Sequence, residues 1–103
     1  MKSILTRYTE YCTFCGKPCY TDHHLVFGRG MRNLAEEDGL KVPACEQCHT
    51  SNSIGDKIHG NPMAEKFSKI AGQLAYEKSK VAEGYTEEEA RELFRKRYGR
   101  SYL

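Results

Sequence analysis

Residues 12–15 read CTFC and residues 45–48 read CEQC, and this doubled pair of cysteines carries the strongest indication of how the chain folds. Two residues between paired cysteines let both thiolates reach one ion from a tight turn, and Zn²⁺ accepts four such ligands in a tetrahedron. Gly16 follows the first pair, where a glycine can take a positive φ and let backbone N–H groups approach the sulfurs. We therefore expect a structural zinc ion held by Cys12, Cys15, Cys45 and Cys48.

Length and composition predict one small domain, residues 1–103, with a modest core. The chain has 39% hydrophobic residues and no Trp, a deficit for which a structural metal would compensate. The fifth cysteine, Cys19, stands outside the CxxC frame, and we expect it to be a packed thiol. The N-terminal MKSILTRYTEY lacks the apolar run of a signal peptide, and no stretch approaches the roughly 18 apolar residues of a membrane helix. These features favour a soluble protein in a reducing cytoplasm, without a membrane partner.

All the histidines of the chain lie around the cysteine frame: they are His23, His24, His49 and His59. Residues 24–27 are typical of a short strand, and the second CxxC pair is expected to open a short helix that fixes the position of His49. A strand facing that helix would bring three imidazoles together, which suits a divalent ion with open positions for phosphate and water. Adjacent strand residues point to opposite sides, however, so His23 and His24 cannot both face one ion without a twist or bulge.

Beyond Gly60 the pattern is helical, and residues 61–103 predict a hairpin of two helices. Asn61 followed by Pro62 is a capping residue with proline at the first helical position, and Gly84 is a natural stop. The apolar face expected for the first helix, which runs to about residue 82, consists of Met63, Phe67, Ile70, Leu74 and Val81.

The second helix is predicted from a capping box formed by Thr86 and Glu89, and it should end before Gly99. Its expected apolar face consists of Ala90, Leu93, Phe94 and Tyr98.

Basic residues are unevenly distributed, although the net charge is only +2. Considered alone, such residues are better explained as a solvated helix face and a loop, but beside a hydrolytic centre they become candidate contacts to DNA phosphates. The candidates are Arg29 and Arg32 after the histidine pair, and Arg91, Arg95, Lys96 and Arg97 near the C-terminus.

The segments DHHLVFGRG, GLKVPACEQCHTS and IHGNP, in this order, resemble an HNH endonuclease of the ββα-metal superfamily, especially the small phage-type forms with flanking zinc knuckles. The resemblance covers roughly residues 11–62. It implies an α+β fold, with a zinc-stabilised ββα-metal finger in residues 1–60 and the pair of C-terminal helices after it. It also implies metal-dependent hydrolysis of double-stranded DNA in the cytoplasm of a bacterial or phage-infected cell.

Carried over residue by residue, the resemblance makes His24 the general base and makes His23, His49 and His59 ligands of a catalytic divalent ion. His23 and His24 are thus the catalytic candidates. The DH version of the family motif would instead make Asp22 the ligand and His23 the base. We prefer the HH version, as in colicin-type DNases, because Phe27 and Gly28 then fall where the family's loop begins. Mg²⁺, Mn²⁺, Ni²⁺ and Zn²⁺ all remain candidates for the catalytic ion.

The asparagine in the middle of the family motif has no clear counterpart. Asn33 lies too far before Cys45, and the register places Asp38, Gly39 or Leu40 at that position. We expect Asn33 to cap a turn or a short helix through residues 35–37.

Two other classes of function compete with the nuclease. One is a non-catalytic zinc module that binds nucleic acid through its basic residues, and the other is a zinc-stabilised interaction domain in a phage packaging or recombination assembly. The spare imidazoles favour the nuclease, because four cysteines already satisfy one zinc ion. One site per chain can only nick DNA, so cutting both strands would need a homodimer or two encounters.

Overall fold

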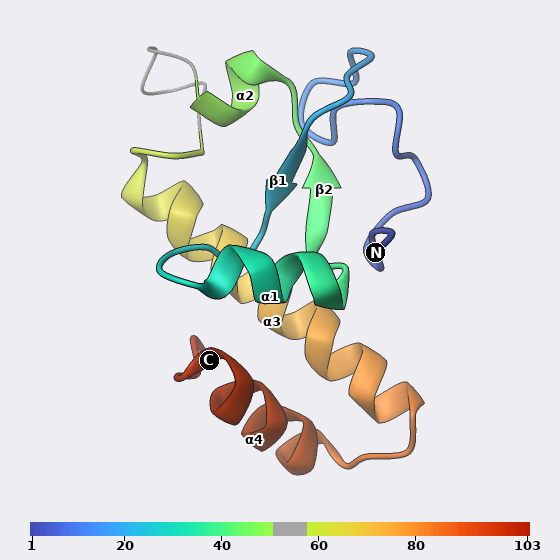
Figure 1. Cartoon of the computed structure of the whole chain (residues 1–103), viewed down its shortest axis with the longest axis vertical. Helices are drawn as coiled ribbons and strands as arrows, with labels where there is room; N and C mark the ends of the chain where they lie inside the picture. The colour runs from blue at the N-terminus through green and yellow to red at the C-terminus, as the bar shows by residue number, and fades with distance from the viewer. Residues whose placement is uncertain (51–57) are drawn as a thin grey trace.

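The computed structural model describes residues 1–50 and 58–103, which form two antiparallel strands and four helices (Figure 1). This confirms the α+β class predicted from the sequence. Residues 51–57, which belong to the predicted metal core, lie outside the described part. In chain order the elements are β1 (Asp22–His24), α1 (Met31–Asp38), β2 (Lys41–Pro43), α2 (Glu46–Thr50), α3 (Pro62–Ala82) and α4 (Glu87–Tyr98). Across the described residues, none of the helices combines the length and apolar character needed to cross a bilayer.

The two strands form a short ribbon at the centre of the molecule, with α1 across one end and α2 beyond the other (Figure 1). His23 lies opposite Val42 and His24 opposite Lys41. The predicted strand over residues 24–27 is wrong beyond His24. One more hydrogen bond, from the amide of Leu25 to Leu40 O at 2.8 Å, continues the pairing, and then Gly28 takes a φ of 124° and turns the chain into α1.

The helix α1 exists where a short helix was expected, but Asn33 does not cap it. The N-cap is Gly30, at a left-handed φ of 79°, and it makes no side-chain capping bond. Asn33 lies inside the helix and is exposed. The turn formed by Gly28, Arg29 and Gly30 therefore starts α1 by backbone geometry, which two glycines permit.

Both C-terminal helices begin and end where the sequence predicted. The side chain of Asn61 accepts a hydrogen bond from the amide of Ala64 at 3.2 Å, and Pro62 occupies the first turn. Thr86 and Glu89 form a reciprocal capping box, and α4 ends at Gly99 with a φ of 84°. Local capping chemistry thus sets the limits of α3 and α4.

The apolar face expected for α3 is wrong. Met63 is 70% exposed and Phe67 is 65% exposed, and Leu74 and Val81 are also on the surface. The helix instead buries Ser68, Gly72, Gln73, Tyr76 and Glu77. Its inward side consists of small and polar residues, which approach the segment after β1 closely at Gly72 and form hydrogen bonds with that segment and with α4.

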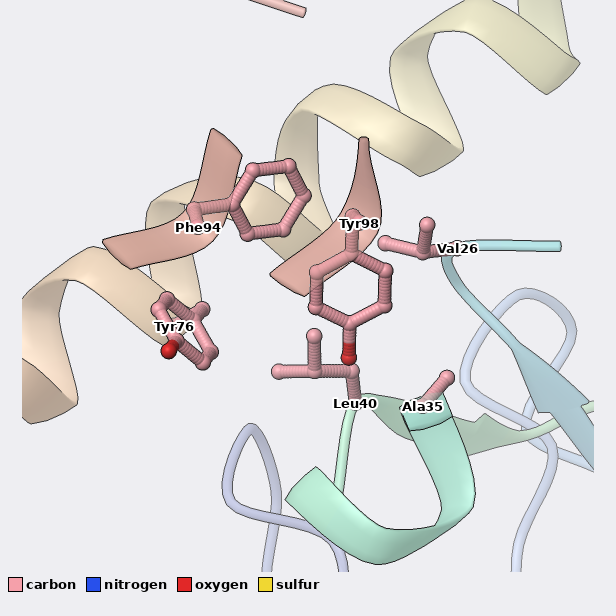
Figure 2. Packing of buried hydrophobic residues seen from close by; sticks show 6 residues of the cluster. All are labelled: Val26, Ala35, Leu40, Tyr76, Phe94 and Tyr98. Atoms are coloured by element: carbon pink, nitrogen blue, oxygen red, sulfur yellow. The ribbon is translucent and has the colours of Figure 1, made fainter. Parts of the chain in front are cut away.

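A hydrophobic cluster joins the two halves of the chain (Figure 2). Val26, Ala35 and Leu40 come from the N-terminal half, and Tyr76, Phe94 and Tyr98 come from α3 and α4. The hydroxyl of Tyr98 donates to Asp38 at 2.7 Å, which fastens α4 to the end of α1. The helical hairpin therefore forms one side of the hydrophobic core, and the N-terminal half of the chain forms the other side.

Candidate metal centres

The four cysteines of the two CxxC pairs come together at one end of the ribbon. Their sulfurs lie within 4.8 Å of one another, with Cys15 Sγ and Cys45 Sγ 3.5 Å apart. Gly16 has the positive φ expected of a zinc knuckle, 79°, and the amide of Phe14 points to Cys12 Sγ at 3.4 Å. This group can hold a structural metal such as zinc, because it offers four thiolates and a backbone donor to a sulfur.

The acidities of these thiols show why a cation suits the cluster. Burial acts to raise the pKa of Cys12, but hydrogen bonds with Cys45, Cys15 and Phe14 outweigh it and lower the pKa to about 6. The pKa of Cys48 is strongly raised, by burial first and then by its cysteine neighbours. Negative charge on one sulfur disfavours charge on the next, so four thiolates need a positive ion among them.

Cys19 is buried and lies outside this group, as expected of a packed thiol. Its Sγ lies 4.0 Å from the carbonyl oxygen of Thr21.

A second group brings together His23, His49 and His59, each from a different element. Each offers a ring nitrogen, and these atoms also lie within 4.8 Å of one another. His23 comes from β1, His49 from α2, and His59 from the turn before α3. The Nε2 atoms of His49 and His59 are 2.8 Å apart. We call these three residues the histidine triad.

Backbone hydrogen bonds join the triad to the cysteine cluster. The amide of His49 donates to Cys45 O at 2.9 Å, and the amide of Ile58 donates to Cys48 O at the same distance. The amide of His59 then donates to His49 O at 3.3 Å. A metal on the cysteines would therefore also hold His49 and His59, which both follow the second knuckle in the chain.

The buried ring of His23 leaves one nitrogen free for a ligand. Its Nε2 lies 2.7 Å from Ser68 Oγ, and the Ser68 hydroxyl itself donates to Leu25 O at 2.8 Å. Ser68 Oγ must then accept from Nε2–H, which leaves a lone pair on Nδ1. Nδ1 is buried and has no hydrogen-bond partner among the described residues. An unpaired buried acceptor is costly, and a metal ion would satisfy it.

The pKa values of two triad members, His23 and His49, are lowered, which favours the neutral form of imidazole that binds metals. Burial is the main cause that lowers the pKa of His23 to about 3, and the neighbouring His49 and His59 add to it. Burial also lowers the pKa of His49, and the positive charges of His59, His24 and Arg32 lower it further.

His24 points away from the triad and has different partners. Its Nε2 lies 2.8 Å from Glu36 Oε1, and Arg32 Nε lies 3.4 Å from its Nδ1. The strand alternation noted in the sequence therefore separates the two histidines, and no bulge in β1 brings them to one ion. His24 nevertheless affects the pKa of both His23 and His49, so it borders the same site.

Asp22, the ligand of the alternative register, does not belong to the triad. Its carboxylate lies 3.6 Å from the ammonium group of Lys41. Of the two registers left open by the sequence, the geometry favours the one with His23 among the ligands.

Three of the six candidate DNA contacts are engaged in ion pairs within the chain. Arg91 binds Glu77, Arg95 binds Glu92, and Arg97 binds Asp38 at 2.6 Å. Arg29, Arg32 and Lys96 are exposed, and none forms a salt bridge with a described carboxylate. Of these three, Arg32 lies within hydrogen-bond distance of a catalytic candidate, His24.

Two residues of the site were not singled out from the sequence. Ser68 resembled any small residue on a helix, and no sequence signal marked it. Glu36 follows Arg32 by one helical turn, which places the two side chains on one face of α1, but this spacing is common on exposed helices.

Separate searches of protein-family models, curated proteins and solved structures found no match to this chain.

Proposed function

We propose that the protein is a metal-dependent HNH-type endonuclease that hydrolyses phosphodiester bonds in double-stranded DNA, with His24 as general base. The observation that carries the proposal is the histidine triad, in which Nδ1 of His23 has no partner among the described residues, in a chain whose cysteines already offer a structural site. A zinc module that only binds nucleic acid needs no second group of this kind.

The arrangement around the triad supports the finer assignment to a ββα-metal finger. The strands β1 and β2 pair antiparallel, with α1 inserted between them in the chain, and α2 follows β2. His23 comes from β1 and His49 from α2. Apart from the inserted α1, this is the strand, strand, helix order that gives the motif its name.

The chemistry assigns separate roles to the two groups of residues. His24 would take a proton from water as the water oxygen forms a bond to phosphorus, and the opposite P–O bond breaks as its oxygen takes up a proton from solvent. A divalent ion on His23, His49 and His59 would supply Lewis-acid stabilisation of the charge on the phosphate oxygens. Arg32, which lies 3.4 Å from His24, would contact the same phosphate.

Supercoiled plasmid is the substrate that tests this proposal. We expect wild-type protein supplied with Mg²⁺, Mn²⁺, Ni²⁺ or Zn²⁺ to nick it, and His24→Ala to lose at least about a hundredfold in rate. Metal analysis should find two ions per chain in the wild type and in His24→Ala. It should find one ion per chain in His49→Ala, because this variant lacks a triad ligand but keeps all the cysteines.

Asn33→Ala serves as the matched control, because Asn33 is exposed on α1 one residue after Arg32. It should cleave like wild type. Full activity in His24→Ala would exclude His24 as base. No cleavage with any ion, from protein that binds DNA and holds one zinc ion, would favour the non-catalytic binding module. Linear product formed without a nicked intermediate would indicate a dimer.

A further inference from the structure

The carboxylate of Glu36 binds the ring of His24 from the side opposite to Arg32. Glu36 Oε1 lies 2.8 Å from His24 Nε2, and Arg32 Nε lies 3.4 Å from His24 Nδ1. The His24 side chain is only 10% exposed, so these contacts restrict its orientation. Any part that Glu36 plays in catalysis rests on the proposed role of His24 as base.

The two partners determine which nitrogen of His24 carries the proton. The Nε group of arginine can only donate a hydrogen bond, so Nδ1 of His24 must be the acceptor and carries the lone pair. An ionised carboxylate can only accept, so Nε2 must be the N–H that donates to Glu36. Both contacts require the same tautomer.

Glu36 is itself held in place by positive charges on its other oxygen. Oε2 lies 2.7 Å from Lys41 Nζ and 3.3 Å from the N-terminal ammonium group of Met1. Lys41 pairs with His24 across the ribbon, so β2 supplies the group that orients the carboxylate. The order of contacts from β2 to the site is therefore Lys41, Glu36, His24.

We propose that Glu36 is the positioning residue for the general base: it holds the His24 tautomer with hydrogen on Nε2, so that Nδ1 is the nitrogen that takes the proton from water. Nδ1 has one lone pair, so it takes that proton once the Arg32 guanidinium leaves its 3.4 Å contact with Nδ1 and binds the substrate phosphate. Glu36 does not contact the reacting atoms, and it acts only through His24.

Glu36→Gln tests this role, because glutamine has almost the same size and shape as glutamate but replaces one carboxylate oxygen with an NH₂ donor. Lys41 and the N-terminus both donate, so the amide oxygen of Gln would face them and its NH₂ group would face His24. A donor at that position requires Nε2 to accept, which moves the hydrogen to Nδ1. We expect kcat to fall at least about tenfold with KM and metal content unchanged.

Nitrogen-15 NMR of the full-length, zinc-loaded protein gives a readout of the tautomer that does not depend on activity. The His24 ring should show hydrogen on Nε2 in wild type and on Nδ1 in Glu36→Gln. Glu37→Gln is the matched control, because Glu37 is the exposed next residue and pairs only with Arg97 among the described residues, at 3.8 Å. It should keep both the wild-type kcat and the wild-type tautomer.

Each outcome decides one of the two proposals. Hydrogen on Nδ1 in wild type, an unchanged tautomer in Glu36→Gln, or unchanged kcat in that variant would overturn the role of Glu36 while leaving the nuclease in place. Wild-type protein that cleaves with none of the ions would instead overturn the proposed function.

Discussion

The hydroxyl of Ser68 joins α3 to β1 and to the segment that follows it. It accepts from His23 Nε2 and donates to Leu25 O, so it fixes both the tautomer and the direction of the His23 ring. Partners of this kind around a ligating histidine typically contribute 10–100-fold in metal affinity. The sequence did not indicate this contact, because 45 residues separate the two side chains.

We therefore expect Ser68→Ala to weaken metal binding at the histidine triad by about 10–100-fold and to leave the cysteine cluster unaffected. Cobalt titration separates the two sites, since only thiolate ligands give a sulfur-to-metal charge-transfer band. Ser79→Ala is the control, because Ser79 lies on the same helix and its hydroxyl donates to Tyr76 O in its own helix. Equal affinity in the two variants would contradict the role of Ser68.

Gly72 allows the closest approach between α3 and the segment after β1. A Cβ atom there would lie 2.7 Å from Val26 Cγ2 and 3.1 Å from Leu25 Cβ. Gly72→Ala should thus destabilise the fold by about 1–3 kcal/mol, although alanine is favoured by about 1 kcal/mol in an exposed helix. Urea unfolding measures the difference. Lys78→Ala, on the exposed face of α3, should change stability by less than about 0.5 kcal/mol. A stabilised Gly72→Ala would show that the helix is not tightly packed there.

At the scale of elements, the sequence predicted the limits of α3 and α4 well because those limits depend on neighbouring residues. Asn61 with Pro62, and Thr86 with Glu89, specify helix starts through bonds that span three or four positions. Which face of a helix is buried depends instead on what the rest of the chain places beside it. The stripe that includes Met63 and Phe67 is apolar, yet α3 packs through Ser68, Gly72 and Tyr76.

The capping box of α4 offers a direct test of this local control. Thr86→Ala removes the oxygen that accepts from the amide of Glu89 at 3.1 Å, and it should cost about 1 kcal/mol. Thermal unfolding measures the change. Thr9→Ala, which alters an exposed threonine near the N-terminus, provides the comparison and should be close to neutral. If the two variants are equally stable, the helix start depends on tertiary packing instead of the cap.

For the whole molecule, spacing predicted the cysteine group because two CxxC pairs define four ligands without knowledge of the fold. The partners of His24 could not be obtained in this way. They depend on how α1 lies across the ribbon, which brings Glu36 to His24 and to Lys41 together. Such contacts follow from the shared core, in which Leu40 and Val26 meet Phe94 and Tyr98.

A shared core also means that losing the structural metal should unfold the entire chain. Apparent binding free energies of structural zinc, about 10–16 kcal/mol, are as large as or larger than the typical stability of a domain, about 5–15 kcal/mol. Cys45→Ser removes one of four ligands, so we expect it to lose zinc and the near-ultraviolet circular dichroism of the buried tyrosines Tyr76 and Tyr98 together.

Cys19→Ser is the matched control, because Cys19 is buried like Cys12 but lies outside the ligand group. It should lose about 1–3 kcal/mol for a buried hydroxyl and still fold and bind zinc. If Cys45→Ser kept its tyrosine signal and melting temperature without zinc, the hydrophobic core alone would hold the fold. The cysteine cluster would then serve only to position the second knuckle, and with it His49.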